Sequence, residues 1–206
     1  YRGYDSAGIA LLNGGLKVYK KAGRVSDLEI FVANKHLKGH VGIGHTRWAS
    51  HGAPSDANAH PQVSASGKLA IVHNGIIENY SVLKQDLRNK GYVFKSETDT
   101  EVLAHFIEEV QQHNRCTLEE AVRLALTKIV GAYALVILSE DLPNTLIAAC
   151  KGSPMVIGIG KDEFFIASDA TPIVEYTDQV VFINDYEIVV IRDNQLSMKS
   201  IKDVPL

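Results

Sequence analysis

The segment AIVHNGIIEN, residues Ala70–Asn79, decides the fold class. Its apolar first half has the composition of a buried strand, which we expect over Leu69–His73. The pair that follows, Asn74 and Gly75, is typical of a tight hairpin turn. A second strand should follow such a turn, yet the next residues carry helical signals, with Asn79 placed to cap a helix. The segment therefore predicts a strand that leads into a helix rather than a hairpin.

Helices follow one another in the middle of the chain. The helix capped by Asn79 is expected to reach Lys90, where Gly91 is a suitable stop. Capping boxes, in which Ser or Thr precedes Glu by three positions, predict three more helices. Their pairs are Ser26 with Glu29 (helix to about Leu37), Thr98 with Glu101, and Thr117 with Glu120 (helix to about Ile129).

Short segments rich in Val, Ile and Phe predict strands on both sides of these helices. Successive helices beside many strands argue against a doubly wound sheet and favour an α+β layered domain. Besides Leu69–His73, the expected strands are Ile9–Leu12, Leu16–Lys20, Val41–His45, Ala132–Leu138, Thr145–Cys150, Val156–Ile159, Phe164–Ser168, Gln179–Ile183 and Glu187–Arg192.

Bulk properties exclude several classes of protein. The 206 residues suit one domain, and a net charge of −3 without a run of Lys or Arg argues against nucleic-acid binding. No apolar stretch approaches the roughly 18 residues of a membrane helix, and the first residues lack a signal-peptide pattern. Two cysteines, Cys116 and Cys150, do not make a disulfide framework. We expect a cytoplasmic domain without membrane or nucleic-acid partners.

Polar residues concentrate in GHTRWASHG, Gly44–Gly52, directly after a predicted strand. Without a function, this segment would be a solvated loop with a packing tryptophan. The segment by itself favours neither this interpretation nor a functional one. Arg47 is nevertheless the residue type suited to bidentate binding of a carboxylate.

Two further segments have a chemical interpretation. An Asn amide and a flexible Gly N–H at the end of a strand, as in Asn74 and Gly75, can form the oxyanion hole that acyl transfer needs. In KSETDTE, Lys95–Glu101, a helix start with acidic residues is the simpler explanation, although Asp99 can also face a ligand amine.

Histidines near these segments do not indicate a metal. His60 and His73 show no Cys or His spacing typical of zinc and belong to no HExxH pattern. We interpret both as hydrogen-bonding supports of the site, and we expect neither metal nor cofactor.

Five segments, in order and in spacing, resemble the class II glutamine amidotransferases, a branch of the N-terminal-nucleophile hydrolases. They are YRGYDSAG, GHTRWASHG, NAHP, HNGIIEN and SETDTE, and the resemblance runs from Tyr1 to about Arg192. Within the class, the first two segments resemble the members that act on fructose-6-phosphate. The resemblance implies a glutaminase domain over residues 1–206, folded as a four-layer αββα sandwich of the N-terminal-nucleophile hydrolase type.

The resemblance also implies roles for matching positions. Arg47 would hold the glutamine α-carboxylate, and Asp99 would hold its α-ammonium. Asn74 and Gly75 would form the oxyanion hole.

Other matching positions would surround the substrate. Trp48, Ser50 and His51 would line the glutamine pocket, with Trp48 also near the ammonia exit. Arg2 would lie close to the nucleophile. Ser50 stands where many relatives have Thr, which keeps the hydroxyl.

The main departure from the family lies at the front of the chain. Family members begin with a catalytic cysteine whose α-amine is the general base; it opens the first strand, and a helix follows. By family spacing, roughly two dozen residues before Tyr1 are absent, and neither Cys116 nor Cys150 is a suitable replacement. We therefore expect a sandwich without its first strand and helix, unpaired backbone groups at the gap, and no glutaminase activity in this polypeptide.

For the intact protein, the resemblance implies that a thiol attacks the glutamine side-chain amide, ammonia leaves, and water hydrolyses the thioester to glutamate. Ammonia would pass to an absent sugar-phosphate isomerase domain that binds fructose-6-phosphate and forms glucosamine-6-phosphate. The intact enzyme is expected to be a homodimer. Two alternatives stay open: the glutaminase domain of an amidophosphoribosyltransferase, and a non-catalytic module that binds glutamine through Arg47 and Asp99.

Overall fold

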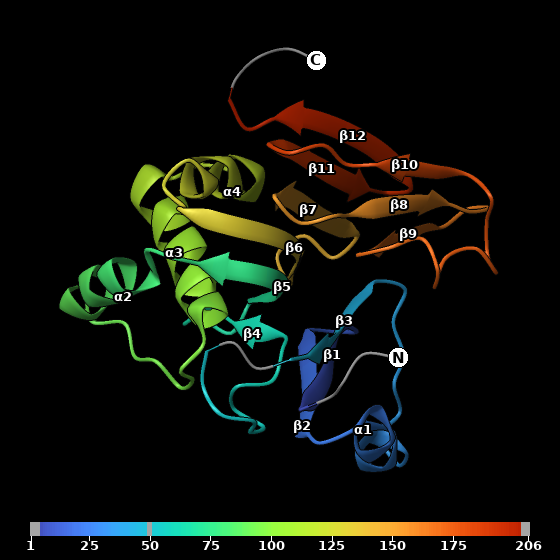
Figure 1. Ribbon diagram of the computed structural model, residues 1–206, viewed down its shortest axis with the longest axis horizontal. Helices are drawn as coiled ribbons and strands as arrows, with labels where there is room; N and C mark the ends of the chain where they lie inside the picture. The colour runs from blue at the N-terminus through green and yellow to red at the C-terminus, as the bar shows by residue number, and fades with distance from the viewer. Residues whose placement is uncertain (1–4, 49–50, 203–206) are drawn as a thin grey trace.

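Four layers make up the protein in a computed structural model that describes residues 5–48 and 51–202. Three helices cover one face of a six-stranded sheet, two three-stranded sheets lie against its other face, and one helix covers the outside (Figure 1). This is the αββα arrangement that the family resemblance implies.

The six-stranded sheet is antiparallel throughout, in the order β12-β11-β7-β6-β5-β4. Both of its faces are buried under neighbouring layers, which explains the near-continuous apolar runs of its central strands. Its strands are β4 (Gln62–Val63), β5 (Leu69–Ile77), β6 (Gly131–Ser139), β7 (Thr145–Lys151), β11 (Glu187–Arg192) and β12 (Gln195–Ser200).

Three helices on one face of this sheet enclose the larger core. They are α2 (Tyr80–Asn89), α3 (Asp99–Asn114) and α4 (Leu118–Leu126). Leu103 and Ile107 of α3 pack on Ile71 of β5, and all three side chains are buried. Two predicted caps form, because the hydroxyl oxygens of Thr98 and Thr117 accept hydrogen bonds from N–H groups three residues on, at 3.2 and 3.3 Å.

The third layer consists of two separate sheets, with strand orders β2-β1-β3 and β10-β8-β9. Helix α1 (Val25–Val32) covers β1 and β2 from outside. Ala10 and Ile43 of the first sheet pack on Val72 and Leu138 of the six-stranded sheet. The strands are β1 (Ser6–Leu12), β2 (Leu16–Ala22), β3 (Gly42–Arg47), β8 (Val156–Ile159), β9 (Phe164–Ala167) and β10 (Val180–Phe182).

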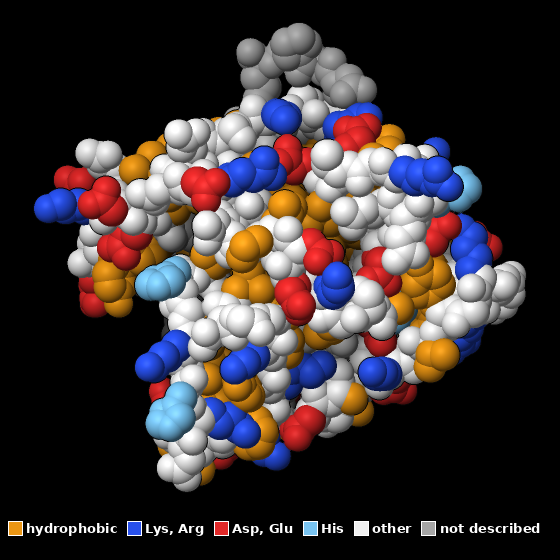
Figure 2. Space-filling model, turned by 180° about the vertical axis from the view of Figure 1, so that it is seen from behind, with side chains coloured by type: hydrophobic (Ala, Val, Ile, Leu, Met, Phe, Trp, Pro, Cys, Tyr) orange, Lys and Arg blue, Asp and Glu red, His pale blue; other side chains and the backbone are white. Residues whose placement is uncertain are grey.

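A slot separates these two sheets. Strands β3 and β9 are edge strands that face each other across a cavity of about 280 Å³, with Val72 and Val136 of the six-stranded sheet at its floor. The space-filling view shows the molecule hollowed on one side between the same two parts (Figure 2). Within the described residues, no strand pairs with the slot-facing edge of β3 or β9, which agrees with the expected unpaired gap.

Several boundaries differ from those predicted. Strand β5 does not end at His73 but continues through Asn74 and Gly75 to Ile77, because all of these residues pair with β6. Strand β3 likewise continues to Arg47, so the polar segment GHTRWASHG begins inside a strand. The short strands β4 and β12 lack the apolar run that predicts a strand.

Helix α1 also starts and ends differently. Its first turn is closed by the Asp27 carboxylate, which accepts a hydrogen bond from the Arg24 N–H at 2.6 Å, and not by the predicted pair Ser26 and Glu29. The helix ends at Val32, short of the expected Leu37.

Candidate functional site

The polar segments singled out in the sequence meet at one end of β3 and β5. Asn58 of the NAHP segment donates to the Glu97 carboxylate at 3.0 Å and accepts from the Glu97 N–H at 2.9 Å. Gly52 lies directly against both residues, because a Cβ added there would come within 2.6 Å of the Asn58 amide and 2.9 Å of the Glu97 Cβ. These contacts bind three loops distant in sequence into one unit.

Asn74 and Gly75 lie within β5 beside this unit. Gly75 is exposed and has a φ of +132°, a backbone conformation that favours glycine. A Cβ at this position would come within 2.1 Å of the Ala132 carbonyl on β6. The Asn74 Oδ1 lies 2.6 Å from the His45 Nε2. A fixed amide and a neighbouring backbone N–H on a rigid strand are the groups that an oxyanion hole requires.

Arg47 is buried at the end of β3, with 3% of its surface exposed. One guanidinium nitrogen, Nη2, donates to the backbone carbonyls of His51 and Gly52 and so shapes the following loop. The other, Nη1, lies 3.6 Å from an Asp5 carboxylate oxygen and has no hydrogen-bond partner among the described residues. One half of the fork therefore shapes the loop, and the other half faces a carboxylate without a hydrogen bond among the described residues.

Asp99 is buried at the first position of α3, where the positive end of the helix dipole stabilises its carboxylate. Its Oδ2 accepts a hydrogen bond from the Ile77 N–H at 2.9 Å. Its Oδ1 has only a long contact, 3.5 Å, with the Thr100 hydroxyl. One carboxylate oxygen thus holds the end of β5, and the other has acceptor capacity left for a cation.

The remaining predicted pocket residues are less enclosed. Trp48 is 77% exposed and stands at the edge of the site. The His51 ring packs edge-on against Tyr80 of α2 at a centroid distance of 4.8 Å. Arg2 and Ser50 lie outside the described residues.

Three histidines lie near Asn74, of which His60 and His73 are buried and His45 is half-buried. The His60 and His45 ring centroids are 4.6 Å apart, and the His73 Nδ1 lies 3.0 Å from the Thr100 hydroxyl. Burial lowers the pKa of His45 to about 4 and holds the pKa of His60 well below its usual value. Burial also lowers the pKa of His73, with the Asp99 charge opposing it. All three rings are therefore neutral at physiological pH.

Neither cysteine of the sequence is placed as a nucleophile for this site. Cys150 is buried in β7, with its thiol near two backbone carbonyls, and burial raises its pKa to about 11. Cys116 lies between α3 and α4 and packs against the helix-side core.

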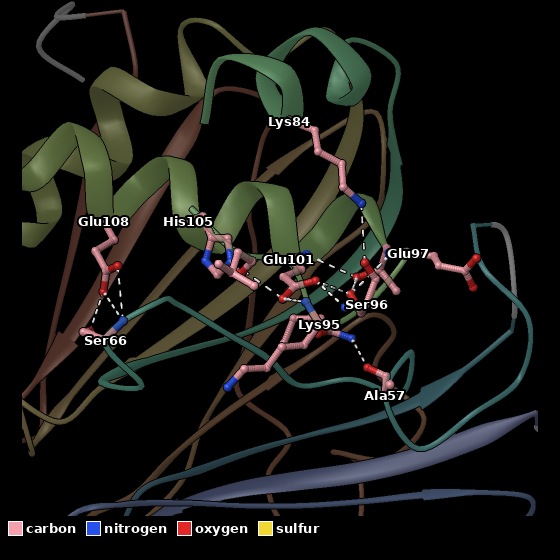
Figure 3. A network of polar contacts seen from close by, with 12 residues as sticks. Ala57, Ser66, Lys84, Lys95, Ser96, Glu97, Glu101, His105 and Glu108 are labelled. Atoms are coloured by element: carbon pink, nitrogen blue, oxygen red, sulfur yellow. Dashed lines mark hydrogen bonds and ion pairs between the residues drawn. The ribbon is translucent and has the colours of Figure 1, made fainter. Parts of the chain in front are cut away.

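A cavity of about 1360 Å³ lies away from Asn74, between β2, β4 and the loop before α3. Figure 3 shows the polar network along it, in which Glu101 accepts from the Ser96 N–H and hydroxyl and Glu108 bonds to Ser66. Lys20 donates to the Ala57 carbonyl at 3.0 Å, and burial lowers its pKa to about 8. Because its buried carboxylates are satisfied by the fold itself, we interpret this network as structural.

The described residues contain no group of three or more His, Cys, Asp or Glu side chains placed to hold a metal ion. None of their helices combines the length and apolar character needed to cross a bilayer.

The sequence does not predict two contacts that shape the site. Its local patterns place His45 in a polar segment and Thr100 at a helix start. Their partners, Asn74 and His73, lie on another layer and in another segment, and no local pattern indicates such pairs.

Comparison with known proteins places the chain in context. A family model described as a glutamine amidotransferase domain matches residues 24–200. The glutamine–fructose-6-phosphate aminotransferase (isomerizing) of Bacteroides thetaiotaomicron is 58% identical over 209 residues, which cover 100% of this chain and 34% of that protein. The protein of the same name from Chlorobaculum tepidum is 52% identical, covering 99% of this chain and 34% of its own length. The chain thus spans about a third of the length of these relatives.

Solved structures agree with this picture. The glutamine phosphoribosylpyrophosphate amidotransferase of B. subtilis, solved with ADP and GMP, has a TM-score of 0.81 and 30% identity, covering 97% of this chain and 43% of that one. A glutamine aminotransferase class-II domain protein from Silicibacter pomeroyi has a TM-score of 0.65 and 14% identity, covering 94% of this chain and 90% of its own. The second likeness supports the fold alone.

Proposed function

The chain belongs to the glutamine amidotransferase family, and from this premise we propose that it is the glutaminase domain of a glutamine–fructose-6-phosphate aminotransferase. The observation that carries the proposal is the 58% identity to a protein of that name over the whole of this chain. The amidophosphoribosyltransferase alternative has weaker support, because the solved example is 30% identical.

In this proposal four groups of the site bind different parts of the glutamine substrate. The Nη1 of Arg47, which faces Asp5 without a hydrogen bond, takes the glutamine α-carboxylate, and the Oδ1 of Asp99 takes the α-ammonium. The side-chain amide then reaches Asn74 and Gly75. When a nucleophile attacks its carbonyl carbon, the Asn74 NH₂ and the Gly75 N–H stabilise the oxygen that gains negative charge.

The nucleophile of the proposed reaction comes from outside these 206 residues. Both cysteines of the sequence lie away from Asn74, as described above. The slot between β3 and β9 continues into a cavity of about 250 Å³ that Asn74 lines, so a strand inserted there would pass the oxyanion hole. We propose this slot as the place of the thiol-bearing segment. The thiol forms a thioester with the side-chain carbonyl carbon (Cδ) of glutamine, ammonia leaves, and water releases glutamate.

The chain by itself is then a glutamine-binding unit without turnover. Titration calorimetry with glutamine, glutamate and asparagine tests binding, and a coupled glutamate assay tests hydrolysis. We expect glutamine to bind with preference over asparagine and no glutamate to form. Absence of glutamine binding would contradict the proposed site, and glutamate release above a no-enzyme blank would contradict the external nucleophile.

The acceptor of the ammonia needs a separate experiment. A form of the protein that includes the remaining two thirds seen in its relatives is incubated with glutamine and either fructose-6-phosphate or phosphoribosyl pyrophosphate. We expect an amino sugar phosphate from the first acceptor and no pyrophosphate release from the second. The reverse outcome would favour the alternative transferase.

A further inference from the structure

His45 has no role in the reaction described so far, yet it contacts the candidate oxyanion hole. Its Nε2 lies 2.6 Å from the Asn74 Oδ1. His45 is on β3, in a three-stranded sheet, and Asn74 is on β5, in the six-stranded sheet. The contact therefore joins two layers of the sandwich at the reacting position.

We propose that His45 is a positioning residue that turns the Asn74 amide so that its NH₂ group, and not its carbonyl oxygen, faces the substrate. This inference rests on the proposed glutaminase function, since it concerns the group that stabilises the oxyanion. It assigns His45 no direct contact with the substrate.

The orientation of the amide decides whether the site works. An Asn side chain has a donor end and an acceptor end of nearly the same shape, and only its hydrogen-bond partners fix which end points where. With Oδ1 bound by His45, Nδ2 points away and has no partner within the described residues. The opposite orientation would direct a carbonyl oxygen at the developing oxyanion, and the two would repel each other.

The proton of His45 lies on Nε2. Burial lowers the pKa of His45 to about 4, so the ring is neutral and carries a single N–H. Its Nδ1 is buried and has no hydrogen-bond partner in the part of the chain that the structure describes. A proton on Nδ1 would leave two lone pairs facing each other at the 2.6 Å between Nε2 and Oδ1, and that separation is too short for an amide N–H donating to a ring nitrogen.

Packing holds the His45 ring in this place. Its ring contacts that of His60 at a centroid distance of 4.6 Å and an angle of 45°. His45 pairs with Gly8 across β1 and β3, and a Cβ at Gly8 would come within 2.2 Å of the His60 carbonyl. Glycine at that position thus allows His60 to reach His45, which in turn holds Asn74.

Nuclear magnetic resonance on the chain as it is tests the hydrogen bond without any activity. In ¹⁵N-histidine-labelled protein at neutral pH, we expect the His45 signals to show a protonated Nε2 and an unprotonated Nδ1. The His45→Gln variant identifies these signals by their loss. A proton on Nδ1, or a charged ring at neutral pH, would overturn the inference.

Kinetics test the consequence in a form of the protein that hydrolyses glutamine. We expect His45→Leu to lower kcat about 10- to 100-fold with little change in KM, because the loss is confined to the transition state. His45→Gln places an amide donor at a similar reach and should recover most of the rate. His113→Leu makes the same substitution at an exposed position near the end of α3, outside the proposed site, and is the matched control.

The two experiments distinguish a failure of the proposed function from a failure of the positioning role of His45. If no form of the protein hydrolyses glutamine, the proposed function fails, and the tautomer measurement still decides the role of His45. Equal kcat in His45→Leu and wild type would overturn the positioning role. So would a loss in His45→Leu that His45→Gln does not recover, if both variants keep the wild-type unfolding midpoint.

Discussion

The Asp99 carboxylate accepts a hydrogen bond from the Ile77 backbone N–H at 2.9 Å, which joins the first residue of α3 to the last residue of β5. The same contact fixes where the oxyanion-hole strand ends relative to the proposed ammonium-binding group. Because the other carboxylate oxygen has just a long contact, 3.5 Å, with the Thr100 hydroxyl among the described residues, structure and ligand binding can share this side chain.

Asp99→Asn separates the two roles. The variant keeps an oxygen that can accept from the Ile77 N–H but loses the charge that would bind the substrate ammonium. We expect glutamine affinity to fall about 10- to 100-fold by calorimetry, the range for losing a charged hydrogen bond, while the fold is kept. The control Asp86→Asn removes the same charge from an exposed position on α2 and should bind glutamine like the wild type. Equal affinity in both variants would contradict the assignment of Asp99.

Gly75→Ala tests the requirement for glycine in the oxyanion strand. The added Cβ would meet the Ala132 carbonyl at 2.1 Å in a residue with φ of +132°. Strain and collision together predict a loss of about 2–4 kcal/mol in the free energy of unfolding, read from urea midpoints. Gly67→Ala is a matched control, because its φ is +80° but nothing lies within 4 Å of the added Cβ. A Gly75→Ala loss no larger than that of Gly67→Ala would contradict the crowding at this strand.

Much of the fold follows from local sequence, and its exceptions have a common cause. Val156–Ile159 and Glu187–Arg192 form strands with the predicted bounds, since their apolar runs are bounded by turn residues. The Asn74-Gly75 pair does not turn, because pairing with β6 continues across it and overrides a local preference. Likewise, β12 forms on an apolar neighbour, β11, rather than from an apolar run of its own.

In the candidate site too, some features follow from local sequence and others depend on how distant segments pack. Residue type and family resemblance predict Arg47 and Asp99 as site residues, and the side chains of both are buried. The sequence does not predict that Arg47 donates to the carbonyls of the loop after it or that Asp99 accepts from the Ile77 N–H. Each of these contacts depends on how separate segments pack.

The depressed pKa values of His45, His60 and His73 predict a loss of stability in mild acid. Their folded pKa values are depressed, so the unfolded chain binds more protons below its histidine pKa of about 6.5. Stability is therefore fully present above that pH and falls as the pH drops toward the folded values. For His45, with a folded pKa of about 4, the integrated loss is about 3 kcal/mol.

Urea midpoints measured between pH 7 and pH 4.5 check this expectation. His60→Phe replaces one buried, neutral ring by another that cannot bind a proton. We expect this variant to have a shallower dependence of unfolding free energy on pH, by up to about 1.4 kcal/mol per pH unit. An unchanged slope would show that His60 does not take up a proton on unfolding in this range.

Hydrogen exchange tests the slot between β3 and β9. Amides on the slot-facing edges of these strands have no partner strand within the described residues, whereas those of β6 are paired on both sides. We expect the slot-facing amides to exchange within minutes at neutral pH, and the β6 amides to exchange only through global unfolding. The paired amides of β3 and β9, which bond to β1 and β8, are the internal control.

The same measurement at several protein concentrations distinguishes an open slot from one filled by a second copy. An open slot gives fast exchange at every concentration, because nothing in solution competes for its backbone groups. Protection that rises with concentration would instead mean that chains pair edge to edge through β3 or β9. Concentration-independent protection equal to that of β6 would contradict the slot, and with it the place proposed for the nucleophile-bearing strand.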